Sequence, residues 1–183
     1  MPSLLRDLNA LGLLAVSFIL LYAFNDQFIA GELPCPLCLL QRVGFAGVLA
    51  GLMLNVCFGC KPAHYSLAIL SAVFGGAVAL RQISLHVIPG TPAYGAPFLG
   101  FHFYTWAFIC FAIIIIGLAI ISSFNQQYQT ASGFKSFRQQ GRLPKVAIAV
   151  ALLVVLTNAL ATFAECGPMV CPDNPVEYWL FNR

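Results

Sequence analysis

The stretch that determines the fold is CPLCLLQRVGFAGVLAGLMLNVCFGC, residues 35–60, an apolar run with a CxxC pair at each end. Read as C-x2-C-x18-C-x2-C, its cysteines have the spacing of a zinc site. The 18 residues between Cys38 and Cys57 would extend about 27 Å as a helix. A shared zinc ion needs all four sulfurs within about 2.3 Å of one point. The stretch is therefore predicted to be a transmembrane helix that separates the two pairs, and no metal site is expected.

The composition supports a membrane protein. Of the 183 residues, 60% are hydrophobic and 8% are charged, whereas soluble domains have roughly a quarter charged residues. No basic patch with interleaved aromatic residues is present, so a nucleic-acid partner is not expected. The chain is predicted to be an integral membrane protein in contact with lipid.

Five segments are long and apolar enough to cross a bilayer, which takes about 20 residues as helix. Backbone amides in lipid must be paired within the segment, so each is predicted to be α-helical. The first segment has no convincing small-residue cleavage site behind it and is treated as a retained helix rather than a signal peptide. The fold class is therefore all-α. The predicted segments run approximately from Leu8 to Phe24, Leu39 to Cys57, Ser66 to Val87, Phe103 to Phe124 and Val146 to Ala164.

Charged residues predict the orientation. Lys and Arg concentrate in cytoplasmic connections. Here six of them fall on one side of the five segments, whereas the other side has five acidic residues against Arg183 alone. The N-terminus is therefore predicted to be cytoplasmic and the C-terminus to lie outside. The basic side has Arg6, Lys61, Lys135, Arg138, Arg142 and Lys145, and the acidic side has Asp26, Glu32, Glu165, Asp173 and Glu177.

This topology sorts the cysteines by compartment. Cys35, Cys38, Cys166 and Cys171 fall on the outer side, where disulfides persist. The other three are expected to be reduced: Cys57 and Cys60 as cytoplasmic thiols rather than a weak metal site or an acylation target, and Cys110 as a small buried hydrophobe.

The outer pairs favour redox chemistry over structural staples. Closing loops as short as C-x2-C and C-x4-C removes little chain entropy, so such bridges stabilise little. Cys38 is expected immediately before a helix, with Arg42 one turn along the same face. Both the helix start and the guanidinium would favour a Cys38 thiolate.

Two further polar residues near outer helix ends have two interpretations. Arg81, like Arg42, either faces the bundle interior or reaches towards the headgroups. His86 is either a proton carrier or a hydrogen-bonded interfacial residue.

The motif CPLCLLQR, residues 35–42, followed by a helix and then by LRQISLHVIPG, residues 80–90, resembles the DsbB family of disulfide-bond-forming membrane proteins. The resemblance covers about residues 8–124. It implies a four-helix bundle that holds a quinone, ubiquinone or menaquinone, near the outer membrane face. Cys38 matches the cysteine next to the quinone, and Cys35 matches its disulfide partner. Arg42 matches the arginine associated with quinone binding, and Arg81 and His86 correspond to polar positions near the same site.

One departure from the family pattern is informative. The second cysteine pair usually lies between the third and fourth helices, where this chain has no cysteine. Instead, a fifth helix leads to an outer tail with Cys166 and Cys171, which we interpret as the relocated pair. The aromatic segment PVEYWLF, residues 175–181, is expected either to keep this pair near Cys35 or to be only an interfacial anchor.

The resemblance predicts three parts and a function. The parts are a four-helix quinone-binding bundle (1–124), a cytoplasmic linker (125–145), and a fifth transmembrane helix with a periplasmic redox tail (146–183). The implied function is a thiol:quinone oxidoreductase of the bacterial inner membrane. It would reoxidise a periplasmic DsbA-like thioredoxin-fold protein, with electrons passing from Cys166 and Cys171 to Cys35 and Cys38 and then to quinone. The alternatives are an epoxide-reductase-like quinone-linked reductase working in another direction and a non-catalytic membrane protein with structural disulfides.

Overall fold

The computed structural model describes residues 2–88, 90–91, 93–95, 97–129 and 133–181. Within them it has five long α-helices and no named strand. Each helix is long and apolar enough to cross a membrane, so the prediction of an all-α, five-span membrane protein is confirmed. The helices are α1 (Pro2–Asn25), α2 (Pro36–Phe58), α3 (Pro62–His86), α4 (Phe103–Ser122) and α5 (Arg142–Cys166).

Short helical turns extend or join these helices. The π-helical turn η1 (Asp26–Ala30) continues α1, and η2 (Asn125–Tyr128) and η3 (Phe137–Gln139) lie between α4 and α5. A last turn, η4 (Trp179–Phe181), lies in the C-terminal tail. Part of the predicted linker, residues 130–132, lies outside the described residues.

All five helices begin at or before the predicted positions, and proline explains two of the earlier starts. Pro36 and Pro62 occupy the first turns of α2 and α3. Proline is favoured there, because its fixed φ suits the helix and its missing N–H has no intrahelical partner at that position. Gly59, with φ of 84°, follows α2 and lets the chain turn sharply into α3.

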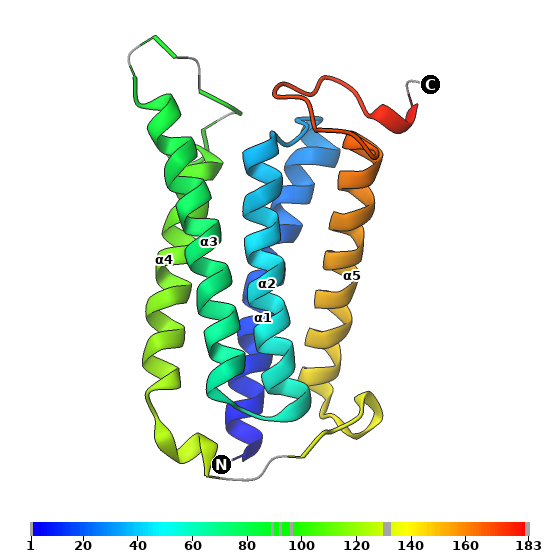
Figure 1. Cartoon of the computed structure of the whole chain (residues 1–183). Helices are drawn as coiled ribbons and strands as arrows, with labels where there is room; N and C mark the ends of the chain where they lie inside the picture. The colour runs from blue at the N-terminus through cyan, green and yellow to red at the C-terminus, as the bar shows by residue number, and fades with distance from the viewer. Residues whose placement is uncertain (1, 89, 92, 96, 130–132, 182–183) are drawn as a thin grey trace.

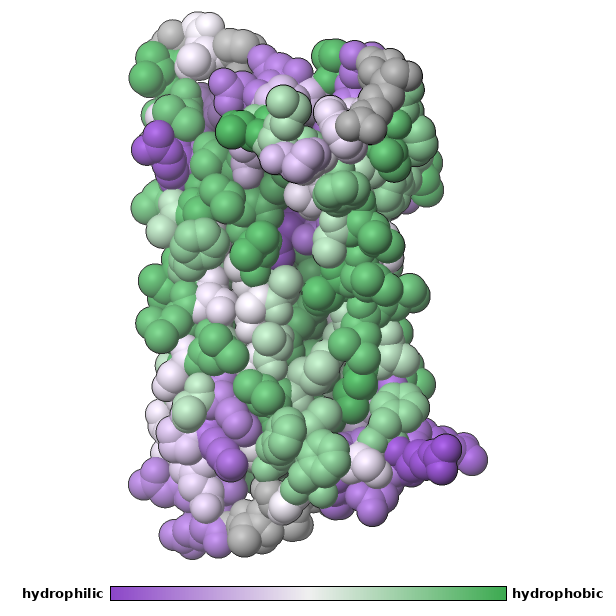
Figure 2. Space-filling view, turned by 45° about the vertical axis from the view of Figure 1, so that its right-hand side comes forward, coloured by the Kyte–Doolittle hydropathy of each residue, from purple (hydrophilic) through white to green (hydrophobic). Residues whose placement is uncertain are grey.

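The helices form an elongated bundle in which α4 and α5 lie on opposite sides (Figure 1). Helix α2 packs against α3 and α1, α3 packs against α4, and α5 packs mainly against α1. The core therefore runs along α2 and its neighbours. Figure 2 shows apolar side chains in a broad band over the middle of the visible face, with hydrophilic side chains gathered at both ends.

Helices α2 and α3 cross closely at a pair of glycines. A Cβ on Gly44 would lie 2.8 Å from Gly75 Cα. The fully buried Phe111 of α4 covers this crossing and stacks on Phe45 with ring centroids 3.9 Å apart. Close backbone approach at small residues is a typical source of helix association in lipid.

The two termini lie at opposite ends of the bundle (Figure 1). The start of α2, the end of α5 and the C-terminal tail share one end, which we call the disulfide end. The two CxxC pairs therefore lie at opposite ends of α2, as predicted.

Candidate active site

A cavity of about 490 Å³ lies near the disulfide end, between α1, α2, α3, α4 and the connection that precedes α4. Its walls are mainly apolar, with aromatic side chains from three of these helices and from the connection. A few polar groups interrupt the apolar lining: Asp26, Glu32, Cys38, Gln41, Arg42 and Gln82.

The Cys35–Cys38 disulfide lies at the edge of this cavity, at the start of α2. Cys35 is the N-cap residue, and its Sγ accepts a hydrogen bond from the Cys38 backbone N–H at 3.1 Å. Cys38 is thus inside the first turn, and the expectation that it precedes the helix is wrong, because Pro36 already starts α2. The amide at the helix start faces Cys35, and of the two cysteines Cys38 lines the cavity.

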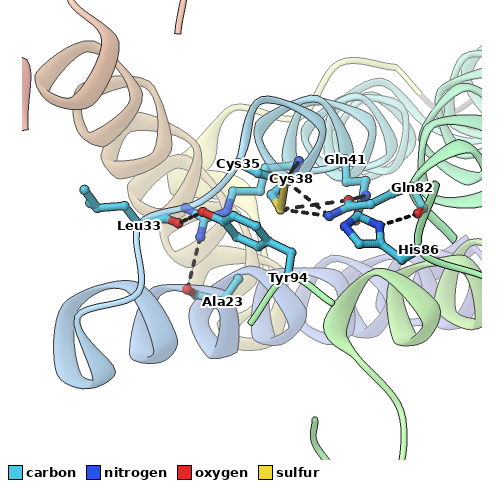
Figure 3. The surroundings of a disulfide bond; sticks show 9 residues. Ala23, Leu33, Cys35, Cys38, Gln41, Gln82, His86 and Tyr94 are labelled. Atoms are coloured by element: carbon cyan, nitrogen blue, oxygen red, sulfur yellow. Dashed lines mark hydrogen bonds between the residues drawn. A yellow bond between two sulfur atoms is a disulfide. The ribbon is translucent and has the colours of Figure 1, made fainter. Parts of the chain in front are cut away.

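Gln82 of α3 contacts both sulfurs of this disulfide. Its Nε2 lies 3.2 Å from Cys35 Sγ and 3.6 Å from Cys38 Sγ, and its Oε1 accepts a hydrogen bond from Gln41 Nε2 at 2.7 Å. Figure 3 shows the Gln82 amide directed at the disulfide, with Gln41 beside it. Gln82 is 1% exposed, so its amide is held in place within the bundle and can donate to a sulfur that gains negative charge.

The sequence reasoning missed Gln82. A signal was present, because Gln82 continues a stripe of small residues at intervals of three and four along α3. These residues form the buried face of the helix, and a polar residue on that face points into the bundle. The stripe consists of Ala68, Ala72, Gly75 and Ala79.

Arg42 lies inside the bundle rather than reaching to the headgroups, with 7% of its surface exposed. Its guanidinium donates to Gln27 Oε1 at 2.5 Å and to the Ala23 carbonyl at 3.1 Å. The same group lies over the Phe24 ring, 5.3 Å from the centroid. Arg42 therefore shares the cavity with Cys38 while its hydrogen bonds go to α1 and η1.

The other two predicted polar residues lie farther from the sulfurs. Arg81 is exposed and is not among the residues that line the cavity. His86 is half-buried, and its Nδ1 lies 2.7 Å from the Gln82 carbonyl, while its ring stacks on Tyr104 with centroids 5.2 Å apart. The structure thus brings Arg42 to the same cavity as Cys38, which is bonded to Cys35. His86 lies behind Gln82 (Figure 3).

The second disulfide, Cys166–Cys171, closes the start of the C-terminal tail. Cys166 is the last residue of α5 and is 5% exposed, whereas Cys171 is partly exposed. Cys171 is therefore the sulfur more accessible to a soluble protein.

The tail folds back onto the bundle. Gln27 Nε2 donates to Tyr178 Oη at 3.1 Å, and the same Gln27 accepts from Arg42. Trp179 packs edge-on against Phe163 of α5, with ring centroids 6.2 Å apart. A chain of side chains therefore joins the tail to the arginine of the cavity.

Tyr94, in the connection between α3 and α4, closes one side of the site. Its hydroxyl donates to the Leu33 carbonyl at 2.5 Å, two residues before Cys35 (Figure 3). Burial raises the pKa of Tyr94, and the negative charges of Glu165 and Glu32 raise it further. The phenol therefore remains a protonated donor at neutral pH.

The remaining cysteines are free thiols. Cys57 and Cys60 lie at the far end of α2, where Cys60 Sγ is 3.7 Å from Asn9 Nδ2 and 3.6 Å from the Tyr65 hydroxyl. Cys110 of α4 is half-buried and lines the cavity. Among the residues that the structure describes, no group of three or more His, Cys, Asp or Glu side chains could hold a metal ion.

The cavity fits a quinone in size and chemistry. Its volume falls within the range of about 300–1,000 Å³ typical of small-molecule sites. Apolar and aromatic walls suit a flat ring with an isoprenoid chain. The amide and guanidinium groups of Gln41, Gln82 and Arg42 are the donors available for ring oxygens.

Comparison with known proteins gives a consistent family assignment. The family model described as "Disulfide bond formation protein DsbB" matches residues 5–96, half of the 183-residue chain. Proteins named "Disulfide bond formation protein B" are similar to this chain over part of its length. The one from Marinobacter nauticus is 41% identical over 92 residues, which cover 46% of this chain and 50% of the relative.

Two other relatives show the same pattern. The protein of that name from Cupriavidus pinatubonensis is 38% identical over 69 residues, 37% of this chain and 43% of the relative. The one from Xanthomonas axonopodis pv. citri is 32% identical over 84 residues, 43% of this chain and 49% of the relative. The chain thus spans about half the length of the curated relatives it matches. No solved structure matches it.

Proposed function

The chain belongs to the DsbB family of disulfide bond formation proteins, and we propose that it is a membrane thiol:quinone oxidoreductase that reoxidises a DsbA-like thioredoxin-fold protein. The observation that supports this most is the placement of its two disulfides. Both lie at one end of the bundle, and Cys38 of the first opens onto an apolar cavity that fits a quinone.

In the first step, a thiolate of the reduced partner attacks Cys171, the more accessible tail sulfur. A mixed disulfide forms with Cys171, and Cys166 leaves with the electron pair of the broken bond. The second thiol of the partner then attacks the mixed disulfide and releases Cys171. The partner is oxidised, and the tail pair is reduced to a dithiol.

In the second step, Cys166 attacks Cys35, and Cys38 leaves as a thiolate. Cys171 then attacks Cys166, which restores the tail disulfide and releases Cys35. Because Cys35 is 6% exposed, this exchange requires the tail to move towards the start of α2. The Gln82 amide, 3.6 Å from Cys38 Sγ, stabilises the departing thiolate through a charge-assisted hydrogen bond.

A quinone bound in the cavity supplies the two-electron acceptor that regenerates the Cys35–Cys38 disulfide. The chain's own residues bind and orient it. Arg42 and Gln41, on the polar side of the cavity, would donate hydrogen bonds to its ring oxygens, and the aromatic walls would exclude water. Cys38 faces this space, so it is the sulfur placed to pass electrons onward.

The compartment follows from charge. Basic residues concentrate at the end of the bundle opposite to the disulfides. By the positive-inside rule that end is cytoplasmic, so we place the disulfide end in the periplasm, with the protein in the bacterial inner membrane. This puts the tail in the oxidising compartment that a DsbA-like partner occupies.

Quinone reduction tests the proposal directly. Purified protein with a reduced thioredoxin-fold oxidase and ubiquinone or menaquinone is expected to form quinol. Cys38→Ser is expected to abolish the reaction, while Cys57→Ser, a free thiol at the other end of α2, is expected to retain it. Turnover by Cys38→Ser at the unmodified rate would contradict the proposal.

A further inference from the structure

Glu165 is a buried acid that the proposed relay does not yet use. It lies near the end of α5, directly before Cys166, and is 2% exposed. Neither carboxylate oxygen has a hydrogen-bond partner among the described residues. An ionised carboxylate without partners is costly in an apolar environment, and the negative end of the α5 dipole opposes its charge further. Such a group requires an explanation.

Glu165 lies one residue before Cys166, at the end of the bundle where α2 also begins with the Cys35–Cys38 pair. Burial raises the pKa of Tyr94, in the α3–α4 connection, and the negative charge of Glu165 raises it further. Tyr94 is hydrogen-bonded to Leu33 beside the Cys35–Cys38 pair. Glu165 thus belongs to the helix that bears the tail disulfide, and its charge affects a tyrosine that is bonded beside the other disulfide.

We infer that Glu165 is the proton donor and acceptor for Cys166 during exchange between the tail and the Cys35–Cys38 pair. This inference rests on the proposed function. A buried sulfur that alternates between leaving group and nucleophile needs a nearby group that first supplies and then removes a proton. Glu165, the residue before Cys166, supplies a buried carboxyl group with both oxygens free to take a proton, which meets this need.

The proton and electron movements balance. When the reductant attacks Cys171, the Cys166–Cys171 bond breaks, and the neutral Glu165 carboxyl protonates the Cys166 sulfur. The second thiol of the reductant then attacks the mixed disulfide and releases Cys171, which takes up the proton of that thiol. In the exchange, Glu165 takes this proton back as Cys166 attacks Cys35, and Cys38 leaves with the electron pair. Cys171 then attacks Cys166, and its proton passes to the released Cys35. The tail pair loses two electrons, and the other pair gains them.

The test is a single exchange in the quinone-depleted full chain. Protein with both disulfides intact is mixed with one equivalent of dithiothreitol, quenched with acid at set times and alkylated, and each cysteine pair is counted by peptide mass. A variant with Cys166→Ser and Cys171→Ser reports direct reduction of Cys35–Cys38, which is subtracted. Glu165→Gln is expected to slow the tail-dependent exchange about 100-fold at pH 7, since general acid–base catalysis typically contributes 10²–10⁴-fold.

The pH profile separates proton transfer from a structural effect. With Glu165→Gln, the exchange is expected to accelerate about tenfold per pH unit, because Cys166 must then lose its proton to water before its thiolate can attack. Glu165→Asp keeps an ionisable group and is expected to recover part of the rate. The exposed tail acid Glu177 gives the matched control, Glu177→Gln, which is expected to exchange like the unmodified chain. The charged and titratable groups at this end of the bundle also contribute to any profile. They are Arg42, Tyr94, Asp26 and Glu32, which line the cavity, and Tyr178, which is hydrogen-bonded to Gln27.

The outcomes are distinguishable. If the unmodified chain shows no tail-dependent reduction of Cys35–Cys38, the relay is overturned and the role of Glu165 with it. If the unmodified chain exchanges and Glu165→Gln matches it within threefold across the pH range, the relay stands and the inference is overturned.

Discussion

Replacing Gln82 by leucine removes the one side-chain amide that contacts both sulfurs of the Cys35–Cys38 disulfide within the described residues. Leucine has a similar volume and suits the buried position. The change also leaves Gln41 Nε2 without the acceptor that lies 2.7 Å away. Because leucine fills a similar space, the Gln82→Leu substitution tests the hydrogen bond from Gln82 to sulfur with little change in the shape of the site.

The magnitude follows from the charge that develops on Cys38. A hydrogen bond to a charged group contributes about 1.5–3 kcal/mol. If Gln82 makes this bond to the departing thiolate and not to the resting disulfide, its loss raises the barrier by a similar amount. At about 1.36 kcal/mol per factor of ten, the exchange between the tail dithiol and Cys35–Cys38 is expected to slow by about 10- to 150-fold.

The assay is the acid-quenched single exchange with counting of each cysteine pair. Gln41→Leu removes the hydrogen bond that positions Gln82 and, in this quinone-depleted assay, is expected to slow the exchange by less than Gln82→Leu. Gln126→Leu, at an exposed position in η2, is the matched control and is expected to have no effect. Exchange by a folded Gln82→Leu variant within twofold of the unmodified rate would refute the role of this amide.

Three further predictions follow from the contacts of the bundle. Arg42→Met removes the hydrogen bonds to Gln27 and Ala23 and is expected to raise the KM for quinone about 10- to 100-fold; a steady-state KM within twofold would contradict a quinone-binding role. Tyr178→Phe removes the hydrogen bond to Gln27, and such a bond contributes about 0.5–1.5 kcal/mol. The tail-dependent exchange is therefore expected to slow by about two- to tenfold. An unchanged rate would mean that this bond does not position the tail. Gly75→Ala places a methyl group against the Phe111 ring and is expected to lower the free energy of unfolding, measured in detergent, by about 1–3 kcal/mol. Gly117→Ala is the control, because a Cβ there meets nothing within 4 Å. Equal stability of the two variants would contradict the close helix crossing.

The helices could be predicted from the sequence because the bilayer sets their length and polarity. A run of about 20 apolar residues must pair its own backbone in lipid, and five such runs became five helices. The same constraint separated the two CxxC pairs, since residues 39–56 form one continuous helix. The tail pair shares an end with Cys35 because the chain crosses the bundle once before Cys35 and five times before the tail, and both numbers are odd.

Rotation of a helix about its axis was harder to predict. Arg81 and Gln82 are neighbours in α3, about 100° apart around the helix, and the motif drew attention to the arginine. Packing of the small-residue face against α2 turns Gln82 inward and leaves Arg81 exposed. A charged residue is conspicuous in an apolar segment, but burial decides which polar residue reaches the site.

Contacts between distant segments could not be predicted either. The packing of α5 against α1 brings the end of α5 to the disulfide end of the bundle, and the bond from Gln27 to Tyr178 attaches the tail. Neither contact has a sequence spacing that indicates it. The segment PVEYWLF was expected either to position the tail or to anchor it at the interface, and the Tyr178 bond supports a positioning role.

The central claim is that electrons pass from the tail pair to the Cys35–Cys38 pair by direct thiol–disulfide exchange. A variant with Cys38→Ser and Cys171→Ser retains only the two sulfurs that form the exchange intermediate, besides the three free thiols. After oxidation, peptide mass analysis is expected to find Cys35 joined to Cys166 in most molecules, and a variant with Cys35→Ser and Cys171→Ser is expected to form far less of the corresponding Cys38–Cys166 product. Recovery of Cys35 and Cys166 unlinked, in a folded protein, would contradict the relay.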